Sequence, residues 1–262
     1  MDLIASFGSC LSDCVANTLA SRRGMKFCSK VLHNRSDYFV QTFIERRNPP
    51  SDLSFLRKHI REGVDTTFLE LVHQNQVPET IGLHQVDCDV PFLERIERGD
   101  LSLLIADNFM DVASNLFEER ATGHFYFSHS AQFDDETFER LFRWREYPSP
   151  FRSLSAFLTI FRWIHEKSPK TKVVFYAFPP VDDGVDRASY GRCREFAKLV
   201  TNQRMELRAL LPWVRFLEAP VARREDIEPG IPDNWSHFTQ AYYDVVTDRL
   251  ELDLRAPTVA TP

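Results

Sequence analysis

Short apolar runs alternate with longer amphipathic segments along most of this 262-residue chain. The run from Leu101 to Ala106, for example, is short and almost continuously apolar, which is typical of a strand buried on both faces of a parallel sheet. Since parallel neighbours need a crossover connection, helices between the strands would cover both faces of that sheet. The pattern predicts an α/β fold with three layers, α/β/α, around a parallel sheet of about five strands. The strand candidates are residues 2–7, 25–32, 101–106, 172–178 and 214–219.

Helical spacing, capping residues and glycine or proline breaks mark the segments between these strands. We expect one domain over residues 1–262, with a middle insertion at about 109–150 that contains a small β excursion at 124–129. Residues 33–37 form a polar loop in this prediction, and 64–90 carry no clear pattern. The helix candidates are 11–22, a segment capped at Ser51 or Asp52 and running to about 62, 91–98, 134–145, 151–166, 187–211 and 240–250.

The composition excludes several classes of protein. A net charge of −6 argues against a nucleic-acid-binding domain, which would normally be basic. Five cysteines without a Cys-x-x-Cys pair argue against a disulfide framework and against a structural zinc site. No apolar run is long enough to cross a bilayer, and the first residues lack a secretory signal. We therefore expect a cytoplasmic protein that binds neither nucleic acid, membrane nor metal, of unknown oligomeric state.

The first strand candidate ends at Gly8, and a helical pattern begins almost at once. A sharp turn from strand to helix exposes one side chain and leaves backbone N–H groups free at the helix N-terminus. Cys10 lies at this turn, where the helix dipole and those N–H groups would favour its thiolate. The sequence therefore predicts that Cys10 is a nucleophile, with the neighbouring hydroxyl of Ser9 as the alternative.

Two further polar groups follow strand candidates. Asn108 comes directly after Asp107 at the end of the third strand, and His237 lies between the last strand and the last helix. Because the carboxyl ends of parallel strands meet at one edge of a sheet, both groups should lie near Cys10. A thiol, an amide and an imidazole in one place suit a nucleophile, an oxyanion donor and a base.

Three blocks of the chain resemble the motifs of the SGNH (GDSL-type) hydrolase superfamily, whose fold is flavodoxin-like. Gly8-Ser9-Cys10 resembles its Gly-x-Ser block with cysteine in place of serine, and Ala106-Asp107-Asn108 resembles its Gly-x-Asn block. Residues 233–239 resemble its Asp-x-x-His block. Cysteine at the nucleophile position is similar to the WcbI-type proteins of capsular polysaccharide biosynthesis, and Gly-Ser-Cys is also similar to the GSCFA-type families.

The resemblance implies an acyltransferase or hydrolase that forms an acyl-thioester on Cys10. His237 would take the thiol proton, and Asn108 and the Cys10 backbone N–H would stabilise the oxyanion. The implied acceptor is a carbohydrate or another hydroxyl-bearing molecule of polysaccharide or secondary-metabolite biosynthesis. Acyl-coenzyme A is implied as the donor, with no bound cofactor. Further candidates for oxyanion or substrate binding are Ser9, Asn34 and Asp107.

The chain departs from the superfamily pattern at two places. A glycine expected after the second strand is missing, and the polar pair His33-Asn34 stands there instead. The carboxylate expected three residues before His237 is displaced, because Asn234 holds that offset and Asp233 lies one residue further back. Either residue could orient His237, since thiolate–imidazolium pairs commonly use asparagine for this purpose. Two alternatives stay open: a simple esterase or thioesterase, and a non-catalytic ligand-binding module that kept the fold.

Overall fold

A computed structural model describes residues 1–63, 67–127, 132–185, 187–229 and 236–255. Its central sheet has five parallel strands in the order β2-β1-β3-β7-β9. This confirms the predicted α/β fold class and each of the five strand candidates to within two residues at either end. The strands are β1 (Leu3–Gly8), β2 (Lys26–Leu32), β3 (Leu103–Asp107), β7 (Lys172–Ala177) and β9 (Val214–Glu218).

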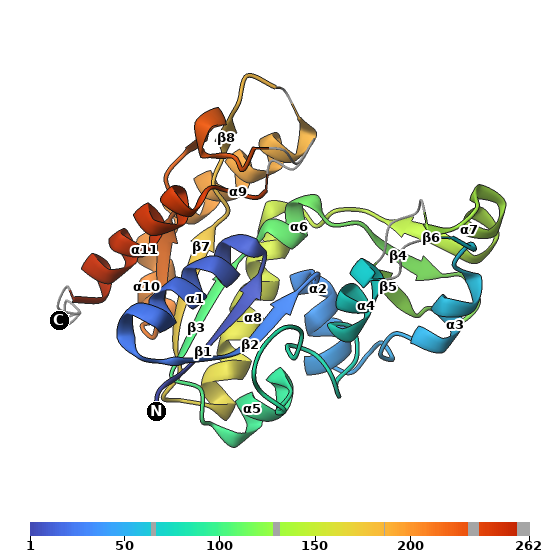
Figure 1. The fold of residues 1–262 in the computed structure, drawn as a ribbon, viewed down its shortest axis with the longest axis horizontal. Helices are drawn as coiled ribbons and strands as arrows, with labels where there is room; N and C mark the ends of the chain where they lie inside the picture. The colour runs from blue at the N-terminus through green and yellow to red at the C-terminus, as the bar shows by residue number, and fades with distance from the viewer. Residues whose placement is uncertain (64–66, 128–131, 186, 230–235, 256–262) are drawn as a thin grey trace.

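Helices cover both faces of the central sheet (Figure 1). On one face, α1 (Cys10–Arg23) and α11 (Gln240–Arg255) lie side by side, joined by ion pairs from Arg22 to Asp244 and Asp248. The other face is covered by α5 (Phe92–Arg98) and α8 (Pro150–Lys167), together with a short region after β2. That region consists of α2 (Ser36–Phe39) and the π-helix η1 (Val40–Ile44). The remaining helices of the described residues are α3 (Leu53–His59), α4 (Thr67–Gln74), α6 (Phe109–Ala113), α7 (Asp135–Leu141), α9 (Ala188–Asn202), α10 (Arg204–Leu210) and the 3-10 helix η3 (Arg224–Asp226).

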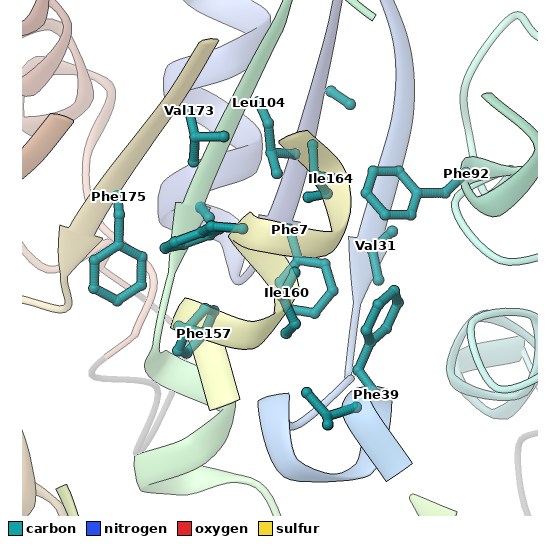
Figure 2. Close-up of a cluster of buried hydrophobic side chains, with 14 of the residues drawn as sticks. Phe7, Val31, Phe39, Phe92, Leu104, Phe157, Ile160, Ile164, Val173 and Phe175 are labelled. Atoms are coloured by element: carbon teal, nitrogen blue, oxygen red, sulfur yellow. The ribbon is translucent and has the colours of Figure 1, made fainter. Parts of the chain in front are cut away.

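Alternate side chains of each central strand enter two separate cores, as the two-residue period of a strand requires. Figure 2 shows the α8 face, where Phe7 of β1 lies among Phe39, Phe92 and Phe157. The ring centroids of Phe7 and Phe39 are 5.0 Å apart, in the edge-to-face geometry that aromatic pairs prefer. The opposite face of the sheet packs against the apolar sides of α1 and α11. Both layers thus fix the start of α1 relative to the strand ends.

A second, smaller sheet lies beside the central one (Figure 1). It is antiparallel, in the order β5-β4-β6, and is formed by β4 (Leu116–Glu119), β5 (Phe125–Phe127) and β6 (Phe142–Arg145). These strands fall within the predicted insertion, and α3 from an earlier part of the chain packs on the same sheet. Their shared core is Leu56, Phe117, Tyr126, Phe133, Phe138 and Phe142. Two further two-residue strands, β8 (Val181–Asp182) and β10 (Ala222–Arg223), pair with each other.

Several predicted elements need correction. The helix predicted at 134–145 ends at Leu141, because residues 142–145 form β6 and pair with β4, Trp144 opposite Phe117. The single helix predicted at 187–211 is two helices, which meet at Gln203. The predicted polar loop at 33–37 already contains the start of α2 at Ser36. Within the described parts of the chain, no helix has the length and apolar character needed to cross a bilayer.

Candidate active site

The turn between β1 and α1 depends on glycine. Gly8 has φ of 140°, a backbone conformation that other residues rarely adopt. A Cβ on Gly8 would lie 2.7 Å from Cγ of Asp107, closer than carbon atoms can approach without displacement. The end of β1 therefore touches the end of β3 directly, and this contact brings Cys10 to the carboxyl edge of the sheet.

Asp107 holds this turn in place. One of its oxygens, Oδ2, accepts hydrogen bonds from the Ser9 N–H at 3.0 Å, the Ser9 hydroxyl at 2.8 Å and the Ser12 N–H at 3.1 Å. The other, Oδ1, accepts from the Phe109 N–H at 2.9 Å. Burial raises the pKa of Asp107, and these four donors oppose that rise. Both oxygens thus have protein partners, so Asp107 supports the turn.

Ser9 is the N-cap of α1. Its Oγ accepts a hydrogen bond from the Leu11 N–H at 3.1 Å while its hydroxyl proton is donated to Asp107. The side chain is buried and has no free proton for a base to take. Ser9 is therefore a structural cap, and the neighbouring Cys10 is the side chain that the turn leaves available.

Cys10 and His237 meet across the chain. Cys10 is the first residue of α1, and its Sγ lies 3.6 Å from Nε2 of His237, within hydrogen-bond reach for sulfur. The segment around His237 is fixed by backbone hydrogen bonds, from Glu228 N–H to the His237 carbonyl at 3.0 Å and from Thr239 N–H to the Asp226 carbonyl at 2.7 Å. The structure thus brings together the predicted nucleophile and the predicted base.

The charge state of Cys10 differs from the prediction of a stabilised thiolate. Burial raises the pKa of the Cys10 thiol to about 12, and the neighbouring groups Cys14, Asp13 and Asp107 raise it further, with Lys30 alone opposing them. Burial also lowers the pKa of His237, against the opposing charge of Glu228. The resting pair at neutral pH is therefore a neutral thiol beside a neutral imidazole, so His237 is in the form that can accept a proton.

Asn108 has an unused donor. It is buried at the carboxyl end of β3, and its Oδ1 accepts a hydrogen bond from the Phe178 N–H at 2.7 Å. Its Nδ2 has no acceptor among the described residues. A buried amide donor without a partner is rare in proteins, and it is the property that an oxyanion donor needs.

Asn34, in contrast, has no donor to spare. Its Nδ2 donates to the Leu32 carbonyl at 3.1 Å and to the Asn75 carbonyl at 2.6 Å, so the side chain ties two loops together. The preceding residue, His33, has φ of 54°, in the left-handed region that favours glycine. The backbone after β2 thus adopts at His33 a conformation that favours glycine, although the residue is not glycine.

Asp233 and Asn234, the two residues predicted to orient His237, lie outside the described part of the chain. Sequence reasoning did not identify Glu228, whose charge raises the pKa of His237 and of Cys14. It also missed the pair formed by Lys30 and Asp13, whose Nζ and Oδ2 are 3.3 Å apart beside Cys10. No spacing rule could have found these residues, because they come from separate elements.

No three His, Cys, Asp or Glu side chains of the described residues come together in a way that could hold a metal ion. The chain matches no protein-family model and no curated protein. Solved structures of similar fold include a family two carbohydrate esterase from Clostridium thermocellum in complex with cellohexaose, at 11% identity and a TM-score of 0.46. That match covers 97% of this chain and 63% of the esterase, so the chain spans less than two thirds of its length.

An aryl esterase from M. smegmatis is also similar, at 11% identity and a TM-score of 0.43, with 97% of this chain and 99% of that one covered. At such identities and scores, neither the activity nor the substrate of these proteins carries over to this chain.

Proposed function

We propose that the chain is an SGNH-like acyltransferase or hydrolase in which Cys10 is the nucleophile. The single observation that carries this proposal is the 3.6 Å contact between Cys10 Sγ and His237 Nε2 at the N-terminus of a helix. A nucleophile and a base within hydrogen-bond reach, at the carboxyl edge of a parallel sheet, are the minimum for covalent catalysis.

The first half-reaction follows from this pair. As Cys10 Sγ attacks the acyl carbonyl carbon, His237 Nε2 takes the thiol proton, and the carbonyl oxygen becomes an oxyanion. The Asn108 Nδ2 and the Cys10 backbone N–H would stabilise that oxyanion. Collapse of the intermediate breaks the bond to the leaving group, which receives the proton from His237, and leaves an acyl-thioester on Cys10.

In the second half-reaction an acceptor hydroxyl attacks the thioester carbonyl while His237 takes its proton. The Cys10 sulfur then leaves and regains a proton from His237. Attack by a carbohydrate or another hydroxyl-bearing acceptor gives transfer, and attack by water gives hydrolysis. Acyl-coenzyme A is the proposed donor, which fits a cytoplasmic protein of polysaccharide or secondary-metabolite biosynthesis.

Direct acylation tests the proposal. The protein is incubated with acetyl-coenzyme A or with an aryl acetate, and the intact mass is measured after a rapid acid quench. The expected result is a gain of one acetyl group, located on Cys10 by peptide mapping and absent from Cys10→Ala. Cys14→Ala is the matched control, since Cys14 lies one turn further along α1, and it should still be acylated. Equal acylation of wild type and Cys10→Ala would refute the mechanism.

The high pKa of Cys10 favours a second candidate, a ligand-binding module that kept the fold but lost the chemistry. Such a protein would have an unreactive Cys10, because a thiol that stays protonated is a poor nucleophile without a working base. The acylation rate of His237→Ala distinguishes the enzyme from the binding module. A drop of about a hundredfold or more in the acylation rate supports catalysis, whereas an unchanged background rate supports the binding module.

A further inference from the structure

A pocket of about 710 Å³ lies apart from Cys10 and His237, neither of which lines it. Its wall is formed by the region after β2, by residues 144–148 and by the start of α8. Arg35, one of the lining residues, comes three residues after Leu32, which pairs with Gly8 in the sheet. The pocket is therefore adjacent to the same edge of the sheet as Cys10, on the face that α8 covers.

The arginine in this wall has a donor that the protein does not use. Arg35 is only 1% exposed. Its Nε and Nη2 bind the two oxygens of Asp37 at 3.0 and 2.6 Å, and Nη2 also donates to the Glu146 carbonyl at 2.9 Å. Its Nη1 is buried without an acceptor among the described residues. A buried guanidinium N–H without a partner needs an acceptor, and a carboxylate oxygen is a strong one because the hydrogen bond is charge-assisted.

A second arginine at the pocket is placed against its local preference. Arg152 lies in the first turn of α8, where the helix dipole disfavours a cation. Its side chain is exposed, and none of the described residues forms an ion pair with it. The other two arginines of the wall are already paired, Arg47 with Glu45 and Arg145 with Glu118. The unpaired positive charge of the wall is thus small and belongs to Arg152, while Arg35, which is paired with Asp37, offers one unused N–H donor.

Aromatic side chains supply the remaining surface. Phe151 is 68% exposed and Trp144 is 48% exposed, and both line the pocket. Trp144 is held by packing against Phe138, with ring centroids 4.9 Å apart. Exposed aromatic faces beside polar groups suit a ligand with one apolar face and a polar rim, such as a sugar ring.

The charged side chains of the pocket wall further restrict the class of ligand. Three carboxylates, Asp37, Glu45 and Glu146, stand in the same wall as the arginines. They would repel the several charges of a polyphosphate more strongly than a single carboxylate, and they can accept hydrogen bonds from hydroxyl groups. We propose that this pocket binds a sugar unit that carries one carboxylate, with that carboxylate at Arg35 and Arg152 and the ring against Trp144 and Phe151. That the sugar belongs to the acyl acceptor rests on the proposed function, whereas the binding site itself does not.

Binding to the Cys10→Ala protein tests the site without any chemistry at Cys10. Calorimetric titrations would use oligosaccharides of glucuronic, galacturonic and mannuronic acid, their neutral counterparts, and adenosine diphosphate. At least one acidic oligosaccharide should bind, about tenfold or more tightly than its neutral counterpart. Equal binding of the two, tighter binding of adenosine diphosphate, or no binding of any acidic sugar would overturn the proposal.

Two exposed residues keep the test independent of folding, since a change at the buried Arg35 could unfold the protein. Arg152→Gln should abolish the preference for the acidic sugar, and Phe151→Ala should weaken binding about fivefold to tenfold. Leu252→Ala on α11, another exposed apolar side chain at 68% exposure, is the matched control and should change nothing. Unchanged binding in both pocket variants would refute the site. Acylation of Cys10, measured separately in wild type, shows whether the proposed function holds.

Discussion

The reactivity of Cys10 is decided by two opposing effects at one residue. A helix N-terminus stabilises a nearby negative charge by about 0.3–1 kcal/mol. The rise of the thiol pKa from 9.0 to about 12 corresponds to roughly 4 kcal/mol against the thiolate. Burial, together with the negative charges that Cys14, Asp13 and Asp107 can carry, therefore outweighs the helix. The prediction of a stabilised thiolate was wrong for this reason, and the thiol depends on His237 to remove its proton.

The rate of Cys10 alkylation, measured as a function of pH, reports the protonation of the thiol directly. For a protonated Cys10, the rate of reaction with iodoacetamide should keep rising with pH past the ordinary thiol range, since its pKa is about 12. Any activity should instead rise as His237 loses its proton, at a pH below the usual histidine value because its pKa is lowered. A plateau in the alkylation rate near the pKa of free cysteine would contradict the raised pKa of Cys10.

Gly8 supports a prediction on stability. Gly8→Ala places a Cβ 2.7 Å from Asp107 and forces alanine to φ of 140°, so it should lower the free energy of unfolding by about 2 kcal/mol or more. Urea denaturation measures the change. Gly191→Ala is the matched control, because Gly191 lies in α9 with open space around it, and it should stabilise by about 0.5–1 kcal/mol. An unchanged free energy of unfolding in Gly8→Ala would show that the turn can relax to accept the side chain.

At the scale of elements, a buried carboxylate joins three helices near the candidate site. Asp111 of α6 accepts hydrogen bonds from the N–H and hydroxyl of Ser36 in α2 and from the hydroxyl of Ser153 in α8. Burial, and secondarily the charge of Asp37, raises the pKa of Asp111 to about 6. This contact fixes the region after β2, which contains Arg35, relative to the helix that follows Asn108.

The raised pKa of Asp111 implies a pH-dependent stability. In the unfolded chain Asp111 ionises near its ordinary value of 3.8, but in the folded protein only near pH 6, so the folded state holds this proton more tightly. The contribution of this proton to the free energy of unfolding is fully present below pH 3.8 and is lost as the pH rises through 6. The loss is about 2–3 kcal/mol. Asp111→Asn should remove this part of the pH dependence, measured by urea denaturation at about pH 4 and about pH 7. If the free energy of unfolding changed equally with pH in wild type and in Asp111→Asn, the raised pKa of Asp111 would be contradicted.

The strands were predictable because each central strand is a short apolar run, and that pattern has few other solutions. The end of α7 was not predictable, because the helical spacing of the sequence continues through Trp144. In the structure, residues 142–145 instead pair with β4 and form β6. Topology alone also placed Cys10, Asn108 and His237 at one edge of the sheet. Charge states and partners such as Glu228 could not be predicted, since they depend on which distant residues pack against the site.

For the whole molecule, the buried aromatic residues belong to three cores, one on each face of the central sheet and one in the small sheet. Phe157 packs in the core of the central sheet, with its ring centroid 4.7 Å from that of Phe175. Phe117 belongs to the core of the small sheet, with its ring 5.1 Å from that of Phe142. The opposite side of β4 and β5 contributes Leu116 and Phe125 to the central core, so the small sheet is attached along one face.

This division predicts that the core of the small sheet can be disrupted without the core on the α8 face of the central sheet. Phe117→Ala should speed amide hydrogen exchange in β4, β5, β6 and α3 while β1, β3 and β7 stay protected, because its cavity opens only the small core. Phe157→Ala is the matched change in the central core and should lower global stability by about 3–5 kcal/mol, with faster exchange in every strand. The Cys10–His237 pair rests on the central sheet, so Phe117→Ala should leave acylation of Cys10 intact. Loss of protection in β1 and β3 in Phe117→Ala would show instead that the two sheets unfold as one unit.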